Sequence, residues 1–488
     1  MVLAAGKGTR MRSRRHKVLH EVAGRPMIWH ILTALHQAGI EPSRTVVVIG
    51  DSAPQVREAV ESAFGTGRYA FALQEPQLGT GHATLQARPY LPDDVSDVVV
   101  AFGDTPLLQA ETVRQLLDRH HAGGRPLTLV SGILDDPTGY GRIVRYSAPE
   151  PAADGAASQP GAVLAIVEER DATPQERRIR EINSGFSVFD AAWLWSHLPR
   201  VGVARNGEIY LTALAAMAVA EGDGVETLVL PQVLETLGVN SRRQLAEAEA
   251  IMRRRLVEAL LDAGVTVQDP ATTYVEAGIA VGQDSVILAN THLCGTTTIG
   301  ADCVVGPNAI VRDSVVGNGC RITASVLTGA VLEEEVAVGP FAHLRPGTRC
   351  GRGSIVGTGS ELNRSTLGAG SRVMHFGYLG DATVGVGVNV GAGTVTCNFD
   401  GREKHPTEIG DGAFVGSGTM LVAPVHVGQE ALTGAGAVVI RDVAAGAKVA
   451  GVPARPIGWR VAPGSAAPEQ AAAEEPAGPP PGSSERGE

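Results

Sequence analysis

The chain has 488 residues, a formal charge of -11 at pH 7 and 44% apolar residues. This length suggests two or three domains with buried cores, and the apolar content excludes global disorder. The acidic balance argues against nonspecific binding to nucleic acid or anionic membranes, since both require basic surface. No apolar run reaches the ~18 residues of a membrane span, and the N-terminus lacks a signal-peptide core. We therefore expect a cytoplasmic protein without nucleic-acid or membrane partners.

Residues 1–233 alternate short apolar runs with helical patterns and form the first expected domain. The runs at 45–49 and 97–102 predict strands. The segments 27–37 and 111–120 predict helices. Strands that alternate with helices indicate βαβ units and a mostly parallel sheet.

A linker helix is expected within residues 234–264. Apolar residues recur at helical spacing through 241–263. Ser241 is a suitable N-cap for this helix, and Gly264 is a suitable terminator.

Residues 265–460 follow a six-residue period in which an aliphatic or small residue is often followed by Gly. One unbroken series is Ile409, Val415, Leu421, Val427, Thr433 and Val439. This repeat is typical of a parallel β-helix whose aliphatic residues point inward. The phase breaks at 397–408, which predicts an external loop. Residues 461–488 are rich in Pro, Ala, Gly, Ser and Glu, and we expect them to be a disordered tail.

Three motifs in the first domain carry chemistry. In LAAGKGTRM, residues 3–11, the glycines let backbone N–H groups approach phosphate oxygens, and Lys17 lies in the basic cluster that follows. In QEPQLGTGHA, residues 74–83, side-chain amides and glycines suit recognition of a base edge. Asp104 follows the strand at 97–102, where a carboxylate suits Mg²⁺ held with substrate phosphates. The alternative role for Asp104 is a plain N-cap of the next helix.

Together with HKVL at 16–19, DDPTGYGRI at 135–143 and EINSG at 181–185, these motifs resemble the sugar-phosphate nucleotidyltransferases. With the hexapeptide half included, about residues 1–460 resemble the bacterial bifunctional N-acetylglucosamine-1-phosphate uridylyltransferase and glucosamine-1-phosphate N-acetyltransferase family. The resemblance implies a Rossmann-like α/β nucleotidyltransferase domain followed by a left-handed parallel β-helix that forms homotrimers. It implies N-acetylation of glucosamine-1-phosphate by acetyl-CoA, then uridylyl transfer from UTP to N-acetylglucosamine-1-phosphate with release of diphosphate.

The same resemblance assigns site residues by motif. The residues implied to bind the uridine nucleotide and its sugar are Leu3, Ala4, Ala5, Gly6, Lys17, Gln74, Gly79, Thr80, Gly141, Glu168, Asn183 and Asn240. Mg²⁺ would be held by Asp104 and Asn240. The residues implied to bind glucosamine-1-phosphate are Arg345, Glu361, Asn363, Tyr378, Asn389 and Lys404. Those implied to bind acetyl-CoA are Ala392, Asn398, Phe399, Ser417 and Ala435. His375 would be the general base that takes a proton from the attacking amine.

Two of these positions depart from the usual family pattern, since Asn363 stands where Lys is common and Phe399 where Tyr is common. The alternative function is a single-activity sugar-1-phosphate nucleotidyltransferase whose β-helix has only a structural or binding role. Four residues favour two activities because a passive β-helix has no need of them: His375, Asn398, Lys404 and Ser417.

Overall fold

The computed structural model describes residues 1–6, 8–50, 53–146, 161–231, 233–236 and 238–459. It divides into two compact units, Met1–Asp262 with Tyr274–Gly278, and Ala263–Thr273 with the chain from Ile279 onward. The expected tail at 461–488 and Lys7 of the first motif lie outside the described residues. None of the helices in the described ranges is long and apolar enough to cross a membrane.

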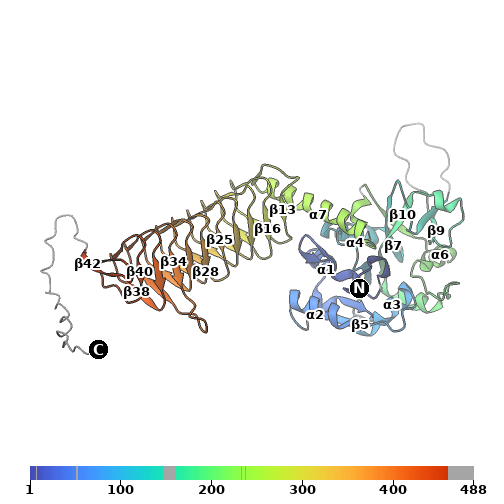
Figure 1. Ribbon diagram of the computed structural model, residues 1–488. Coiled ribbons are helices and arrows are strands. Elements are labelled where there is room, and N and C mark those ends of the chain that lie inside the picture. Colours follow the sequence, from blue (N-terminus) through green and yellow to red (C-terminus); the bar gives the residue numbers. More distant parts are fainter. Residues whose placement is uncertain (7, 51–52, 147–160, 232, 237, 460–488) are drawn as a thin grey trace, which may run out of the picture. The chain divides into compact units, whose positions relative to one another are not determined.

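A mixed β-sheet forms the centre of the first unit, with strand order β11-β7-β10-β6-β1-β4-β5 (Figure 1). Its strands are β1 (Val2–Leu3), β4 (Val46–Ile49), β5 (Ala70–Leu73), β6 (Asp97–Phe102), β7 (Leu127–Ile133), β10 (Glu181–Asp190) and β11 (Glu226–Leu230), with β8 (Arg142–Arg145) and β9 (Val163–Val167) attached through β10. The strands β6, β1, β4 and β5 are parallel, but β10 runs antiparallel between β6 and β7. Because β11 also pairs parallel with β7, β10 is the one reversed strand of the seven in this order, and the expectation of a mostly parallel sheet is confirmed.

Helices cover both faces of this sheet. They are α1 (Met27–Gln37), α2 (Ala53–Phe64), α3 (Thr80–Ala87), α4 (Ala110–Gly123), α5 (Ala191–His197), α6 (Ala213–Ala220) and α7 (Arg242–Asp262). Val47 and Ile49 pack into one core with α1, α2 and α4, whereas Val46 and Val48 pack into the other with α3, α5 and α6. Burial on both faces explains why this strand is an unbroken apolar run in the sequence.

The helix expected at 241–263 is α7, and it belongs to the first unit. Its first turn is capped by Ser241, whose Oγ accepts a hydrogen bond from the backbone N–H of Gln244 at 3.3 Å. Gly264 follows the helix with φ +84°, a backbone conformation that favours glycine. Ala248 of α7 lies in a small core with Val22 and Met27 of the same unit.

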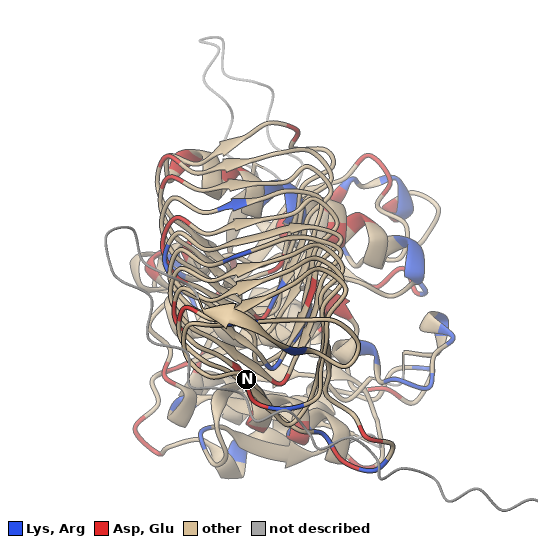
Figure 2. Cartoon of the chain, turned by 60° about the vertical axis from the view of Figure 1, so that its left-hand side comes forward, with Lys and Arg blue, Asp and Glu red and all other residues tan. Residues whose placement is uncertain are grey.

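The second unit is a parallel β-solenoid, as the hexapeptide period predicts (Figures 1 and 2). Each coil contributes one short strand to each of three sheets, which we call faces 1, 2 and 3 in the order the chain visits them. Face 1 runs from β12 (Thr266–Val267) to β42 (Arg455–Trp459), face 2 from β16 (His292–Cys294) to β40 (Val438–Val439), and face 3 from β14 (Ala280–Val281) to β38 (Val425–Val427). Figure 2 shows acidic and basic residues interspersed around the stacked coils.

The site-bearing strands belong to the later coils. On face 1 they are β27 (Ile355–Thr358), β30 (Arg372–His375), β33 (Asn389–Val390), β36 (Phe414–Val415) and β39 (Leu432–Thr433). On face 2 they are β25 (His343–Leu344), β28 (Glu361–Asn363), β31 (Tyr378–Gly380), β34 (Val395–Cys397) and β37 (Met420–Val422). The loop 398–406 leaves the stack between β34 and β35 (Thr407–Ile409) of face 3, where the phase break predicts it.

The six residues of the predicted series, Ile409 to Val439, are each no more than 2% exposed. On face 2 the inward side chains of successive coils form a buried ladder that comprises Leu327, Leu344, Leu362, Leu379, Thr396 and Leu421. Such inward stacks of aliphatic side chains form the core of the solenoid, because each coil buries its apolar surface mainly against its neighbours.

We expect Leu362→Ala to lower the free energy of unfolding of the solenoid by about 2–5 kcal/mol, because it leaves a cavity between two coils. Native-state hydrogen exchange of the amides in β25, β28 and β31 measures this loss locally. The matched control is Thr366→Ala on the exposed side of β29 (Thr366–Leu367), which should change the same quantity by less than about 0.5 kcal/mol. Equal protection in both variants would contradict the packing account.

Candidate functional sites

The glycine-rich motif leaves β1 at the carboxyl end of the sheet. The backbone N–H of Ala4 donates to the carbonyl of Val48 at 2.8 Å, and Gln77 Nε2 donates to the carbonyl of Ala5 at 2.7 Å. Gly8 has φ +61°, and a Cβ at this position would lie 2.6 Å from Cβ of Lys17. The turn therefore requires glycine, because the stem of Lys17 packs directly against it.

Lys17, Asp104 and Asn240 meet at this edge of the sheet. The Lys17 ammonium pairs with Asp104 Oδ2 and donates to Asn240 Oδ1 at 3.0 Å. The backbone of Asp104 is fixed as well, because its carbonyl accepts a hydrogen bond from the N–H of Val239 at 2.8 Å. Asp104 does not cap the next helix, because the N-cap of α4 is Gln109. A carboxylate oxygen and an amide oxygen thus face one positive group.

A cavity of about 250 Å³ lies beside this triad within the first unit. Six of the sequence-predicted residues line it: Thr80, Asp104, Gly141, Glu168, Asn183 and Asn240. They come from α3, from the ends of β6, β9 and β10, and from the segments before β8 and α7. The structure therefore brings together residues that are as much as 160 positions apart in the sequence.

Glu168 is a half-buried carboxyl group in the wall of this cavity. Its Oε1 accepts a hydrogen bond from Thr212 Oγ1 at 2.8 Å, and burial raises the pKa of Glu168 above its usual value. Gly141 lies against the same wall, since a Cβ on Gly141 would lie 3.2 Å from Ile166 Cγ2 and 3.5 Å from Glu168 Oε2. The backbone N–H of Asn183 donates to the carbonyl of Gly141 at 2.8 Å, which fixes the two walls relative to each other.

The cavity also includes residues that the motif analysis missed. Tyr140, Tyr210 and Thr212 line its wall, and burial raises the pKa of both tyrosines. Tyr140 lies inside the DDPTGYGRI motif, so its position beside Gly141 was a usable signal. Tyr210 and Thr212 stand in no recognisable motif, and only the tertiary fold brings them to the cavity.

The second motif is ordered by its own hydrogen bonds. Gln74 is 4% exposed, and its Nε2 donates to the carbonyl of Gly79 at 2.9 Å. Gly79 precedes α3 with φ +94°, and Thr80 Oγ1 accepts from the backbone N–H of Leu211 at 3.0 Å. Of the other predicted residues, Leu3 to Gly6, Lys17, Gln74 and Gly79 are not part of the 250 Å³ cavity wall. Lys17 adjoins the cavity through its contacts with Asp104 and Asn240.

In the solenoid, four predicted residues stack along the corner between faces 1 and 2, which we call corner 1–2. The carbonyl of His375 accepts from Gly393 N–H at 3.1 Å, that of Ala392 from Gly418 N–H at 2.7 Å, and that of Ser417 from Gly436 N–H at 2.8 Å. These bonds connect successive coils at His375, Ala392, Ser417 and Ala435. His375, Ser417 and Ala435 are exposed, so this corner presents an accessible row with one imidazole at its end.

Face 2 carries polar side chains next to that row. Arg345 Nη1 pairs with Glu361 Oε1 at 3.1 Å, and Tyr378 is aligned with Glu361 on the next strand. Gly380 leaves space along this strand, because a Cβ there would lie 2.6 Å from the Tyr378 hydroxyl. Asn389 lies instead on face 1, paired in register with Arg372 and Phe414.

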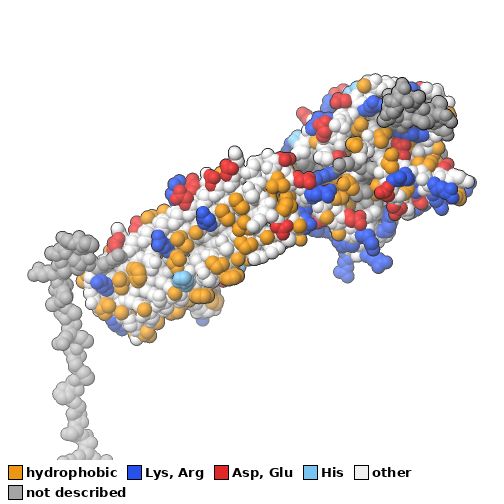
Figure 3. Space-filling view, turned by 90° about the horizontal axis from the view of Figure 1, so that it is seen from above, with side chains coloured by type: hydrophobic (Ala, Val, Ile, Leu, Met, Phe, Trp, Pro, Cys, Tyr) orange, Lys and Arg blue, Asp and Glu red, His pale blue; other side chains and the backbone are white. Residues whose placement is uncertain are grey.

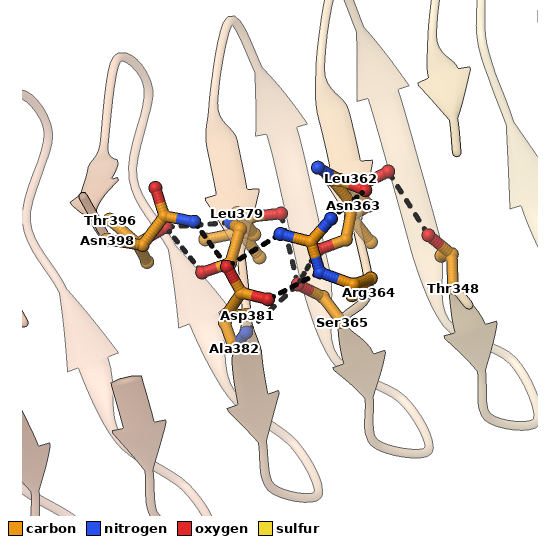
Figure 4. Close-up of polar contacts among 11 residues, drawn as sticks. Thr348, Leu362, Asn363, Arg364, Ser365, Leu379, Asp381, Ala382, Thr396 and Asn398 are labelled. Carbon is orange, nitrogen blue, oxygen red and sulfur yellow. Dashed lines mark hydrogen bonds and ion pairs between the residues drawn. The ribbon is translucent and has the colours of Figure 1, made fainter. Parts of the chain in front are cut away.

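The remaining predicted residues lie at the corner between faces 2 and 3, which we call corner 2–3. Asn363 is 4% exposed, and its Oδ1 accepts from Arg364 Nη1 at 3.4 Å. Asn398 is 6% exposed, and its Nδ2 donates to Asp381 Oδ2 at 2.6 Å (Figure 4). Phe399 and Lys404 are exposed and form an isolated β-bridge that closes the base of the 398–406 loop. The amide oxygen of Asn363 is therefore already engaged by Arg364.

Comparison with known proteins agrees with both units. Residues 1–159 match the family described as MobA-like NTP transferase domain. The chain is 46% identical to the bifunctional protein GlmU of Heliobacterium modesticaldum over 92% of this chain and 94% of that relative. It is 48% identical to the GlmU protein of Pelotomaculum thermopropionicum, covering 87% and 89% of the two chains, and 46% identical to that of Carboxydothermus hydrogenoformans, covering 88% and 91%.

Identity at this level over nearly the whole length extends to both the α/β unit and the solenoid. This match argues against the alternative of a single-activity enzyme with a structural β-helix, since it includes the coils that carry His375 and the 398–406 loop. The chain therefore belongs to the GlmU family of bifunctional enzymes, in which uridylyl transfer and acetyl transfer reside in one polypeptide.

Proposed function

We propose that the first unit transfers the uridylyl group of UTP to N-acetylglucosamine-1-phosphate. The observation that carries this proposal is the Lys17–Asp104–Asn240 triad at the edge of a cavity lined by Gly141, Glu168 and Asn183. A phosphate oxygen of the sugar 1-phosphate attacks the α-phosphorus of UTP, the bond from that phosphorus to the bridging oxygen breaks, and diphosphate leaves. This reaction depends on positioning and charge neutralisation more than on covalent catalysis by the protein.

Within this scheme the motif residues bind and orient. The backbone of Leu3–Gly6, with Gln74, Gly79 and Thr80, holds the uridine nucleotide at the carboxyl end of β1. Lys17 contacts a phosphate, as its ammonium already lies at the cavity edge. Glu168, Asn183 and the backbone of Gly141 hold the N-acetylglucosamine moiety, for which a half-buried carboxyl group and an amide provide directional hydrogen bonds.

Asp104 and Asn240 fit Mg²⁺. Their two oxygens converge on one cationic group, and a carboxylate with one further oxygen ligand is a usual protein contribution to a site that substrate phosphates complete. In the described ranges no group of three or more His, Cys, Asp or Glu residues is arranged to hold a metal, which agrees with such a sparse ligand set. When bound, the ion neutralises charge on the substrate phosphates. Asp104 and Asn240 fix its location, and Lys17 adds a second positive charge.

We propose that the solenoid transfers the acetyl group of acetyl-CoA to the amine of glucosamine-1-phosphate. His375, at the end of the corner 1–2 row, takes a proton from the amine while the amine nitrogen forms a bond to the thioester carbonyl carbon. The carbon–sulfur bond then breaks, and the thiolate of coenzyme A leaves with the electron pair and takes up a proton. Glu361 orients the amine, Asn398 lines the acetyl site, and Ala392, Phe399, Ser417 and Ala435 contact the coenzyme.

The sugar phosphate needs cations, and we assign this role to Arg345 and Lys404. Both are exposed and cationic, whereas Asn363 is uncharged and its Oδ1 already accepts from Arg364. Tyr378 and Asn389 complete the proposed set of sugar-phosphate ligands. Since all four substrates are phosphorylated or coenzyme-linked metabolites made inside cells, we propose that the enzyme works in the cytoplasm.

We also propose a homotrimer. The solenoid exposes apolar side chains at corner 1–2 and on face 2, including Phe341 at 72%, Phe376 at 68%, Ile310 at 41% and Val326 at 37% exposure. Apolar side chains are also visible along the solenoid in the space-filling view (Figure 3). Exposed apolar side chains of this size favour contact with another chain, and cyclic symmetry closes such contacts.

We expect Asp104→Ala to abolish uridylyl transfer and to leave acetyl transfer nearly intact. The substitution removes the only carboxylate of the proposed Mg²⁺ ligands and leaves Lys17 without its ion-pair partner. Both activities are measured on one preparation, by release of diphosphate and by release of free thiol. Parallel loss of the two activities would contradict the separation of the sites.

The opposite selectivity is expected for His375→Ala. Loss of a general base should reduce acetyl transfer by about 10²–10⁴-fold at saturating substrates. Uridylyl transfer from supplied N-acetylglucosamine-1-phosphate should not change. Because His375 is exposed, the melting temperature should stay close to that of the wild type. Near-normal acetyl transfer by the folded variant would remove His375 from this role.

Light scattering of the purified chain at micromolar concentration should give three times the mass of one chain. A charged substitution in the apolar surface, Phe376→Glu, should shift this mass downward and lower acetyl transfer more than uridylyl transfer, since Phe376 directly follows His375. A single-chain mass for the wild type would rule out the trimer.

A further inference from the structure

Three side chains form a ladder across successive coils at corner 2–3; Asn398 is assigned to the acetyl site above, whereas Arg364 and Asp381 have no role so far. Arg364, Asp381 and Asn398 are spaced 17 residues apart, so each stands one coil beyond the last. Arg364 and Asp381 both adopt positive φ angles, +48° and +51°, which turn their side chains along the corner. Figure 4 shows the carboxylate of Asp381 between the guanidinium of Arg364 and the amide of Asn398.

The Arg364–Asp381 contact is bidentate. Nε donates to Oδ1 at 2.7 Å and Nη2 to Oδ2 at 2.9 Å, the geometry that fixes a carboxylate in plane and position. The stem of Arg364 packs over Gly347 of the preceding coil, where a Cβ would lie 3.3 Å from its Cγ. The hydrogen bonds from Arg364 and Asn398, aided by the charge of Lys404, lower the pKa of Asp381, so this group stays ionised in mildly acidic solution.

An ionised carboxylate only accepts hydrogen bonds, and this decides the orientation of Asn398. Its –NH₂ group must face Asp381, with the 2.6 Å contact from Nδ2 to Oδ2, and its carbonyl oxygen must point away. Asn398 is 6% exposed, so rotation of the amide would bury an unpaired carbonyl against a carboxylate. Gly380 provides the space for this arrangement, because a Cβ there would lie 2.5 Å from Asn398 Nδ2 and 2.6 Å from the Tyr378 hydroxyl.

We propose that Asp381 is a positioning residue of the acetyl-transfer site. Arg364 holds Asp381 in place, and Asp381 in turn fixes the amide of Asn398 so that the amide oxygen of Asn398 faces the substrates. The inference rests on the proposed acetyl-transfer function. The locked oxygen accepts from an N–H donor. Two substrates carry such donors, the pantetheine amides of acetyl-CoA and the amine of glucosamine-1-phosphate. Asp381 itself touches neither substrate and acts through Asn398.

The test is a double-mutant cycle on the full-length enzyme with Asp381→Asn and Asn398→Ala. Asp381→Asn keeps the shape of the side chain but permits the amide of Asn398 to turn. We expect kcat/KM for acetyl transfer to fall about 10-fold, the loss that corresponds to one well-placed hydrogen bond. In the Asn398→Ala background the same substitution should change kcat/KM less than 2-fold.

Two further readouts separate positioning from a general loss of structure. A rise in KM for acetyl-CoA alone identifies the pantetheine as the donor, and a rise in KM for glucosamine-1-phosphate alone identifies the amine. The matched control is Glu334→Gln, which removes another ion pair between coils, Arg352 Nη2 to Glu334 Oε2 at 2.9 Å, that involves none of the site residues. It should leave both KM values unchanged. Uridylyl transfer should be unchanged in every variant.

Independent, multiplicative losses from the two substitutions would overturn the inference, as would full acetyl transfer by Asp381→Asn. Full activity of Asn398→Ala beside an impaired Asp381→Asn would overturn it as well, since Asp381 would then act through another group. In each case acetyl transfer by the wild type, measured in the same assay, shows whether the proposed function itself still stands. Arg364→Lys should give an intermediate loss, because an ammonium keeps the charge but not the two parallel hydrogen bonds.

Discussion

The hydrogen-bonded stacking of one coil on the next determines where every side chain of the second unit lies. Backbone N–H groups at the corners donate to carbonyls one coil earlier, and the strands of each face pair in parallel register. The side chain of a residue therefore contacts the equivalent side chains one coil before and one coil after it, and its contacts with its sequence neighbours are fewer. His375 joins the row of Ala392 and Ser417 at one corner, and Asp381 joins Arg364 and Asn398 at another, for this single reason.

In the first unit the corresponding constraint is the shared edge of parallel strands. β1 and β6 are adjacent, with Leu3 paired to Phe102, so the segments that begin at Ala4 and at Gly103 emerge side by side, and Asp104 follows at once. Lys17 reaches the same edge from a short 3₁₀ helix because Gly8 leaves room for its stem. The Lys17–Asp104 ion pair is largely shielded from water, with side-chain exposures of 13% and 15%, so removal of either partner leaves a costly unpaired charge.

The sequence predicts the solenoid core and α1 accurately because both depend on a local period of apolar residues. It does not predict that β10 runs antiparallel, because residues 186–189 of β10 are buried on both faces, as in the parallel strands of the same sheet. The corner 2–3 ladder cannot be predicted from the six-residue period either. Three ideal hexapeptides would space equivalent residues by 18, but Arg364, Asp381 and Asn398 repeat every 17 residues, so an ideal count misaligns them. The cavity residues Tyr210 and Thr212 stand in no motif and reach the site only through the tertiary fold.

The coil register thus sets the acetyl-transfer site, with a linear row at corner 1–2 for the coenzyme and a rigid acceptor at corner 2–3. A crystal structure of the chain with coenzyme A bound tests this account most directly. We predict that the pantetheine follows Ala435, Ser417 and Ala392 along corner 1–2 and places its sulfur beside His375. Coenzyme A bound along another corner, with its sulfur remote from His375, would contradict the account.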